Sequence, residues 1–309
     1  MSQEPKAEAL LLPDRSRRKL ERLMFSPLRI RSGAMKGDRR SIKRGMSTEF
    51  ADYRNYAPGD DLRRLDWNVY ARLEKPYIKL YEDEEDLAVH ILLDASDSMA
   101  WQAETEGIPQ DESRNKWLFA RRILAALAFI SLASNDYLSL SPLSNARLKP
   151  YGPVRGKAFG VGMLRYVHAL KSAGITDLNV ELKNYAARTK RPGLVIIISD
   201  LFSPSGYLQG IDALLGRGHE VVLIHCLSPE EIDPPMVGDL SLIDIESGQS
   251  REVTVDPSMR HLYQQRFEQW IETIRSDCNR RSVPYLFARS DESWEKLIMQ
   301  DLRRTGILK

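Results

Sequence analysis

The 309-residue sequence lacks long apolar runs of the kind that mark membrane proteins. Its longest apolar-rich stretch, 123–133, falls well short of the ~20 residues that a membrane-spanning helix needs. The N-terminus opens with an acid and a proline, and its Leu10-Leu11-Leu12 run is too short for a signal-peptide core. These absences predict a protein without a membrane span and with a cytoplasmic location.

Cysteine is scarce and neither sign of charge dominates. Cys226 and Cys278 have a spacing that predicts neither a disulfide framework nor a metal-binding motif. The five histidines are scattered without ligand spacing. Lys and Arg total 45 against 43 Asp and Glu, so the net charge of +2 favours no polyanionic partner for the whole chain. A soluble globular protein with a core built from its 42% hydrophobic residues is therefore expected.

Composition divides the chain into three parts. Residues 1–44 form a basic N-terminal extension with a short helical leucine stripe. Residues 45–85 are rich in aromatic and charged residues and predict turns and short strands that pack on the main domain. Over 86–309, strand-like and helical runs alternate, which predicts an α/β fold with a doubly wound, mostly parallel sheet and helices on both faces.

The alternation gives approximate element positions in this main domain. Strands are expected at 87–93, 136–141, 146–151, 194–199, 220–226 and 284–289. Helices are expected near 114–134, 157–172, 178–188, 206–216, 258–280 and 291–304. One segment, 228–256, departs from the pattern and predicts a β-hairpin insertion around a glycine-containing turn.

Oxygen-bearing side chains follow three of the predicted elements. Asp94, Ser96 and Ser98 come at the end of the first strand, Thr176 precedes a helix, and Asp200 ends the most apolar strand. Ligands of open α/β sheets bind outside the carboxyl ends of the strands, so the five side chains are expected to converge there. Hard oxygen ligands without thiol or imidazole suit Mg²⁺, with Mn²⁺ or Ca²⁺ as alternatives. Taken singly, each acid or hydroxyl is better explained as a helix or turn cap, but the whole set at one sheet edge favours the metal site.

This set resembles the von Willebrand factor A-type domain, whose metal-ion-dependent adhesion site is written Asp-x-Ser-x-Ser, then a distant Thr and a distant Asp. The pattern is complete here, and the similar order of elements covers about two thirds of the chain. The resemblance implies that Ser96, Ser98 and Thr176 make the direct or nearly direct metal contacts. It also implies that Asp94 and Asp200 act partly through waters and hydrogen bonds to the hydroxyls.

A longer motif lies upstream of that domain. It reads Glu49-Phe50-x-Asp52-Tyr53-Arg54-x-Tyr56-x-Pro58-Gly59-Asp60-Asp61-x-Arg63-x-x-Asp66-Trp67-x-x-x-Ala71-Arg72. This string resembles the bacterial domain of unknown function family 58. The resemblance implies a bacterial cytoplasmic protein whose companions are MoxR-type AAA+ ATPases, with a role in assembling, activating or inserting metal into client proteins.

Some of these charged and aromatic residues are candidates for a partner-binding surface, namely Arg54, Asp60, Asp61, Arg63, Asp66 and Trp67. The favoured interpretation is structural, because such a composition builds an ion-pair network around aromatic packing. For the basic extension, a helix packed on the domain is favoured over nucleic-acid contact, because no recognised nucleic-acid module or interleaved aromatic residues are present.

The leading hypothesis is a non-catalytic, divalent-metal-dependent protein-binding module that serves as a chaperone-like adaptor for a MoxR-type ATPase. A metal-dependent phosphohydrolase with Asp94 as nucleophile is an alternative. It is disfavoured because haloacid-dehalogenase-type enzymes carry a second Asp two positions after the nucleophile, where this chain has Ser96. Nucleic-acid binding by the arm 15–44 is a third hypothesis, and it predicts binding that weakens steeply with salt.

Overall fold

The computed structural model of the chain describes residues 11–26, 50–57, 60, 62, 65–81, 87–100, 115–235, 238–243 and 250–309. The chain divides into two compact units. The main unit contains residues 1–35 and 87–309, and the small unit contains residues 36–86. No helix among the described residues is long and apolar enough to cross a membrane.

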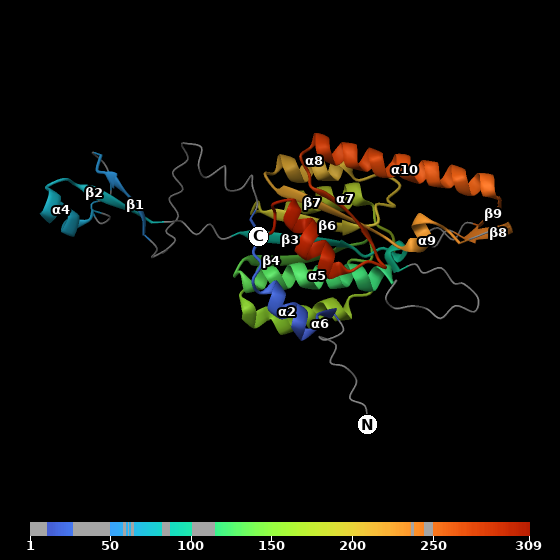
Figure 1. Ribbon diagram of the computed structural model, residues 1–309, viewed down its shortest axis with the longest axis horizontal. Coiled ribbons are helices and arrows are strands. Elements are labelled where there is room, and N and C mark those ends of the chain that lie inside the picture. Colours follow the sequence, from blue (N-terminus) through green and yellow to red (C-terminus); the bar gives the residue numbers. More distant parts are fainter. Residues whose placement is uncertain are drawn as a thin grey trace, which may run out of the picture. The chain divides into compact units, whose positions relative to one another are not determined.

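A six-stranded sheet forms the centre of the main unit, with the strand order β10-β7-β6-β3-β4-β5. Its middle strands β7, β6, β3 and β4 are labelled in Figure 1. The strands are β3 (Ala88–Asp94), β4 (Tyr137–Leu143), β5 (Tyr151–Arg155), β6 (Leu194–Ser199), β7 (Glu220–Leu227) and β10 (Tyr285–Arg289). All neighbouring strands are parallel except β5, which pairs antiparallel with β4 at the edge. Every residue of β3, β6 and β7 is buried, as expected for strands covered on both faces.

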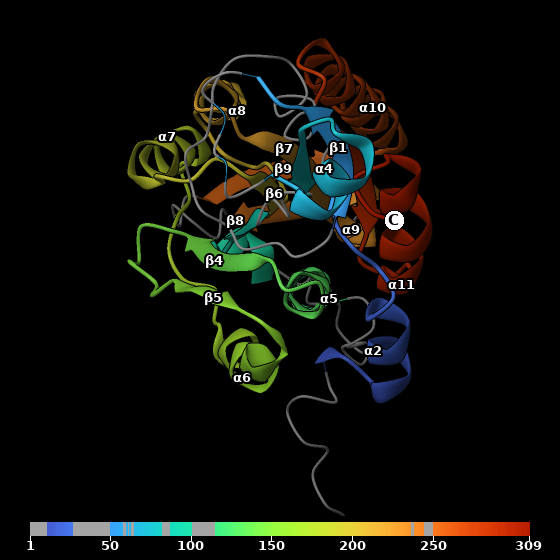
Figure 2. The same ribbon diagram turned by 90° about the vertical axis from the view of Figure 1, so that its left-hand side faces the viewer.

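Helices cover both faces of this sheet (Figure 2). One face carries α5 (Lys116–Ala133) and α6 (Gly160–Ala169), whose buried side chains share a hydrophobic core with Ile91. The other carries α7 (Leu178–Arg188), α8 (Leu208–Gly216) and α10 (Pro257–Arg280), which pack around Ile197. The predicted mixed α/β fold with a mostly parallel sheet and helices on both faces is confirmed.

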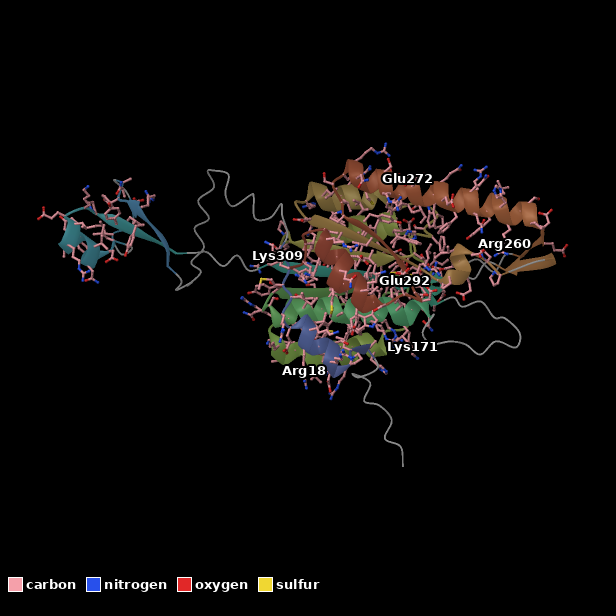
Figure 3. All side chains as sticks on the ribbon, viewed as in Figure 1. Arg18, Lys171, Arg260, Glu272, Glu292 and Lys309 are labelled. Carbon is pink, nitrogen blue, oxygen red and sulfur yellow. The ribbon has the colours of Figure 1, made fainter. Side chains whose placement is uncertain are left out.

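The described part of the N-terminal extension packs against the main unit. Helix α2 (Asp14–Leu20) buries Leu20, and Phe25 forms an isolated β-bridge with Leu308 near the C-terminus. Leu23 of the predicted leucine stripe is buried as well, whereas Met24 is exposed. Arg18 of this helix projects from the surface and is labelled in Figure 3.

Three predicted elements were wrong in detail. The strand expected at 146–151 is β5 instead, because Gly152 and Pro153, which argue against a strand, are tolerated at an edge. The helix expected from 157 begins with a 3-10 turn, Lys157–Phe159. The helix expected over 291–304 is α11 (Trp294–Lys296) followed by a π-helical segment, Leu297–Leu302.

The insertion after β7 contains the predicted hairpin. Strands β8 (Gly238–Ile243) and β9 (Ser250–Val255) pair antiparallel, and their turn lies outside the described residues. A short helix that the alternation does not predict, α9 (Pro229–Ile232), precedes the hairpin. A Ser-x-x-Glu capping box starts it, with Ser228 as N-cap and Glu231 as its partner.

The small unit consists of an antiparallel pair, β1 (Phe50–Asn55) and β2 (Tyr77–Tyr81), and one helix. Short strands are confirmed, but helix α4 (Trp67–Leu73) replaces a region predicted as turns and strands. The cause is local, because the Asp66 carboxylate accepts hydrogen bonds from the backbone N–H groups of Asn68 and Val69 and so caps the helix.

Candidate metal site at the carboxyl edge of the sheet

Two aspartates stand at the carboxyl ends of neighbouring central strands. Asp94 is the last residue of β3 and Asp200 directly follows β6, which pairs with β3 in parallel. Thr176 lies just before α7, and its hydroxyl donates a 2.9 Å hydrogen bond to the carbonyl of Leu143 at the end of β4. Three adjacent strand ends therefore bring the acids and hydroxyls predicted from the sequence to one place.

The Asp94 carboxylate orients the loop that follows it. Its Oδ1 accepts hydrogen bonds from the backbone N–H and the hydroxyl of Ser96, at 3.1 and 2.8 Å. Its Oδ2 accepts one from the hydroxyl of Ser199, at 2.6 Å. The hydroxyl oxygens of Ser96 and Ser98 lie 2.9 Å apart. Asp94 is only 2% exposed, and it fixes the Ser96 hydroxyl directly and the Ser98 hydroxyl through Ser96.

The segment that carries Thr176 is tied to the same loop. Asp97 donates its backbone N–H to the carbonyl of Gly174, and its carboxylate accepts the Gly174 N–H at 3.0 Å. Gly174 has φ +76°, and a Cβ there would come within 2.2 Å of the side-chain oxygen of Asn145. The positive φ and this close approach favour glycine, and the two Asp97–Gly174 hydrogen bonds hold the Thr176 segment beside the β3 loop.

Electrostatics at this edge favour the binding of a cation. Burial raises the pKa of the Asp94 carboxyl to about 6, and the negative charge of Asp200 adds to the rise. Hydrogen bonds from Ser199, Thr176 and Ser96 oppose it. Two acids held close together out of water destabilise each other's charged form, so a cation that neutralises them would be bound favourably.

One cation in the site comes from the chain itself. The Lys116 ammonium, at the start of α5, is fully buried and lies 2.8 Å from Oδ2 of Asp200 and 2.5 Å from Oε1 of Glu231. Burial by itself lowers the pKa of Lys116, but the two carboxylates outweigh it and the net shift is upward. Lys116 is therefore charged, and it balances one of the three carboxylates gathered here.

The helix-cap alternative holds for one acid only, whereas Asp94 and Asp200 each cap a turn by accepting the backbone N–H two residues further on. Asp177 is the N-cap of α7, where its carboxylate accepts a hydrogen bond from the Val180 N–H at 3.0 Å. Asp94 caps no helix, because its oxygens bond to Ser96 and Ser199. Asp200 does not cap α8, whose N-cap position is occupied by Tyr207.

The donor set fits a hard divalent cation. No three His, Cys, Asp or Glu side chains in the described ranges are grouped as a metal site, so a metal here would need the hydroxyl oxygens as well. Ser96, Ser98 and Thr176 supply three, and Asp94 and Asp200 supply the charge. With Glu231 and Lys116, the cluster carries two net negative charges when all four groups are ionised, equal to the charge of one Mg²⁺ ion.

The surface around the site is partly apolar. Ile175 and Phe202 flank Thr176 and Asp200 in sequence, and both are exposed, as is Val180 in the first turn of α7. A cleft of about 830 Å³ adjoins the site through Leu143, whose carbonyl accepts the Thr176 hydroxyl. Exposed apolar side chains beside a polar centre are typical of protein-binding surfaces.

The partner-binding candidates lie in the small unit. Arg54 and Asp60 form a 2.8 Å ion pair, and Asp66 accepts a 2.8 Å hydrogen bond from the Tyr53 hydroxyl in addition to capping α4. These contacts fit the structural interpretation. Trp67, in contrast, is 60% exposed and makes an edge-to-face contact with the exposed ring of Tyr70. The remaining candidates, Asp61 and Arg63, lie outside the described residues.

Sequence reasoning did not find Lys116, Glu231 or the role of Ser199. A signal for Lys116 existed, because a lysine in the first turn of a helix opposes the helix dipole and calls for an acidic partner. Glu231 was visible as part of a Ser-x-x-Glu capping box, but its contact with Lys116 joins residues 115 positions apart. Such a contact has no local signature.

The main unit thus belongs to the class of doubly wound α/β proteins with an oxygen-rich polar cluster at the carboxyl edge of the sheet. Residues 52–272 match the model of a family described as protein of unknown function DUF58, and the chain belongs to this family. Uncharacterized proteins of Mycobacterium bovis and Mycobacterium tuberculosis are 30% identical over 285 residues, which covers 89% of this chain and 86% of theirs.

Solved structures show weaker similarity. A crystal structure described as conserved hypothetical protein BatB from Bacteroides thetaiotaomicron is 13% identical, with a TM-score of 0.41, over 71% of this chain and 98% of that one. An aerotolerance-related membrane protein from Bacteroides fragilis is also 13% identical, with a TM-score of 0.40, over 71% and 99%. Similarity at this level carries no inference about function.

Proposed function

We propose that this protein is a non-catalytic, divalent-metal-dependent protein-binding module with a von Willebrand factor A-like main unit. Asp94, Ser96, Ser98, Thr176 and Asp200 would hold Mg²⁺, with Mn²⁺ or Ca²⁺ as alternatives. The observation that carries the proposal is the convergence of three hydroxyls and two buried carboxylates from three adjacent strand ends. Exposed apolar side chains around this centre support protein binding.

The hydrogen bonds of the two acids support different roles for the carboxylates and the hydroxyls in metal binding. Both oxygens of Asp94 and both oxygens of Asp200 accept hydrogen bonds, which occupy part of their lone-pair capacity, and both acids supply negative charge. The hydroxyl oxygens keep lone pairs for an ion. A bound ion with mainly neutral ligands stays electrophilic and can take a carboxylate from another protein. By family resemblance, the partners would be a MoxR-type AAA+ ATPase and a client protein, in the cytoplasm.

Metal titration tests the site first. We expect isothermal titration calorimetry with MgCl₂ to show one ion per chain, and Asp94→Ala to weaken binding by roughly 10–100-fold. Asp177→Ala is the matched control, because Asp177 is an acid next to Thr176 that caps a helix and leaves the cluster intact. Equal Mg²⁺ affinity in wild type and Asp94→Ala would refute the metal site.

Partner capture tests the binding role. Affinity purification from the native cell in Mg²⁺ is expected to retain an AAA+ ATPase or a client that EDTA and Asp94→Ala both release. If the wild type in Mg²⁺, the wild type in EDTA and Asp94→Ala all retain the partner equally, partner binding does not depend on the metal and the proposed role is refuted.

The phosphohydrolase alternative has less support from the geometry. The ammonium of Lys116 bonds to Asp200 and Glu231, while Asp94, the required nucleophile, is engaged by serines and nearly inaccessible. Phosphatase turnover that Asp94→Asn abolishes would support this alternative. The nucleic-acid hypothesis rests on the basic arm 15–44, most of which lies outside the described residues, and a gel shift at physiological salt tests it.

A further inference from the structure

The proposed function leaves one fully buried charge, the Lys116 ammonium, without a role in binding. Lys116 lies in the first turn of α5, directly after the N-cap Asn115. A cation is disfavoured there, because the N-terminal end of a helix carries partial positive charge. A fully buried ammonium adds a desolvation cost. Because of both costs, the charged Lys116 side chain is stable at this position only with acidic hydrogen-bond partners.

Those partners hold Asp200 in one orientation. The Lys116 ammonium bonds to Oδ2 of Asp200, and the Phe202 N–H donates to Oδ1 at 3.1 Å. On its other side, the ammonium bonds to Glu231, whose second oxygen accepts the Ser228 N–H at 2.7 Å. The α9 capping box therefore fixes Glu231, Glu231 fixes Lys116, and Lys116 fixes Asp200.

We propose that Lys116 is a positioning residue that keeps Asp200 out of the inner coordination shell of the metal ion and so limits the affinity of the site for the bare ion. The inference rests on the proposed function. For Asp200 to ligate an ion directly through Oδ2, it would have to break a buried ion pair. The ion therefore remains short of one anionic ligand, which a carboxylate of a partner protein can supply.

Two effects of Lys116 must be separated, since it both engages Asp200 and adds positive charge. Lys116→Met removes both at once and leaves two buried acids without their cation, which threatens folding. Lys116→Met combined with Glu231→Gln removes one charge of each sign, so the net charge of the cluster stays as in the wild type. In this double variant only the engagement of Asp200 is lost.

We expect the double variant to bind Mg²⁺ at least tenfold more tightly than the wild type in calorimetry. Glu231→Gln alone keeps Lys116 on Asp200 and lowers the negative charge, so it is expected to bind Mg²⁺ more weakly. Lys183→Met is the matched control, because Lys183 is an exposed lysine that bonds to Gln209 on the neighbouring helix. Its Mg²⁺ affinity is expected to stay within twofold of the wild type.

Mn²⁺ gives a readout that a purely structural role of Lys116 would not change. Water molecules bound directly to Mn²⁺ relax the protons of bulk water. If Asp200 enters the inner shell, it displaces one of them, and the relaxation enhancement per bound ion falls. We expect a lower enhancement for the double variant than for the wild type or Lys183→Met.

The outcomes separate the two proposals. A wild type that binds neither Mg²⁺ nor Mn²⁺ overturns the proposed function and this inference with it. A wild type that binds both ions, with a double variant of the same affinity and the same water relaxation, overturns this inference alone. Tighter binding with lower relaxation in the double variant supports it.

Discussion

Toward the amino end of β3, His90 is buried in a neutral and closed network, whereas Asp94 at the carboxyl end of the same strand is buried among charges. The Tyr185 hydroxyl donates to Nδ1 of His90 at 2.8 Å, and Nε2 donates to the Arg191 carbonyl at 3.2 Å. His219 accepts the Gly193 N–H beside it. Both ring nitrogens of His90 therefore have uncharged hydrogen-bond partners.

The carboxyl end is built differently. Asp200 and Glu231 share the internal cation Lys116, Asp94 adds a third buried carboxylate, and the hydroxyl oxygens of Ser96 and Ser98 lie 2.9 Å apart beside it. The two ends of the strand therefore differ in charge balance, which is neutral around His90 and net negative around Asp94. Under the proposed function, this excess of negative charge is what would attract a cation.

The largest expected effect comes from removing the internal cation. Lys116→Met is expected to lower the free energy of unfolding by about 3–5 kcal/mol in EDTA, because it leaves buried carboxylates uncompensated. Urea denaturation followed by circular dichroism measures this change, with Lys183→Met as a control that stays within about 0.5 kcal/mol. A loss below about 1 kcal/mol would show that the carboxyl end does not depend on its lysine.

His90 at the amino end is expected to contribute to the acid sensitivity of the fold, as is His225 of β7, whose pKa burial lowers to about 3. Burial, with the nearby His219 as a smaller cause, lowers the pKa of His90 from 6.5 to about 4. The unfolded chain therefore takes up this proton first as the pH falls. Stability from neutral His90 is complete above pH 6.5 and decreases down to pH 4, where the loss levels off at about 3 kcal/mol.

His90→Gln removes this titration and keeps groups that can hydrogen-bond to Tyr185 and Arg191. Its free energy of unfolding, measured in urea at several pH values, is expected to fall less between pH 6.5 and 4 than that of the wild type. His261→Gln, at an exposed position of α10, is the control and should follow the wild type. Parallel profiles for all three proteins would refute a role of His90.

Asp94→Asn, unlike Lys116→Met, is expected to raise the free energy of unfolding of the metal-free protein. Replacing a buried carboxylate that Asp200 repels relieves both the burial cost and the repulsion, so the metal-free protein should gain about 1–2 kcal/mol. Thermal unfolding in EDTA measures this, and stabilisation by added Mg²⁺ should be lost in the same variant. A variant clearly less stable than the wild type in EDTA would mean that Asp94 serves the fold rather than a ligand.

The smallest expected effect tests whether burial, rather than position at the carboxyl edge, distinguishes the cluster. Asp177 lies next to Thr176 but is only partly buried, and a hydrogen bond from Ser205, with that from Val180, lowers its pKa. Asp177→Ala should cost about 1 kcal/mol through loss of the α7 cap and leave Mg²⁺ affinity unchanged. A large loss of affinity would extend the site to this residue.

Much of the fold was predictable because its signals are local. Strand β6 and helix α7 begin and end within one residue of the bounds that the sequence pattern predicts. Strand β5 was misplaced because the tolerance of an edge strand for Pro153 depends on its neighbours. Helix α4 was missed because a single side chain, Asp66, caps it within a segment rich in turn residues.

Exposed charged residues show a second limit of prediction from sequence patterns. Arg260 and Glu272, both labelled on α10 in Figure 3, look alike in sequence as charged residues of one long helix. Arg260 forms a bidentate pair with Asp233 beside α9, while Glu272 bonds to Arg275 within its own helix. Periodicity predicts that both are exposed, but it does not predict their partners.

The sequence by itself determined the alternation of strands and helices and the Asp94-x-Ser96-x-Ser98 loop with its distant Thr176 and Asp200, because hydrophobic period and strand-end position are properties of local segments. Only the tertiary structure decided that Lys116 joins Asp200 and Glu231, which are 84 and 115 positions away from it. The strength of an ion pair depends on the distance between the charges and on their burial, and the spacing of residues along the chain specifies neither.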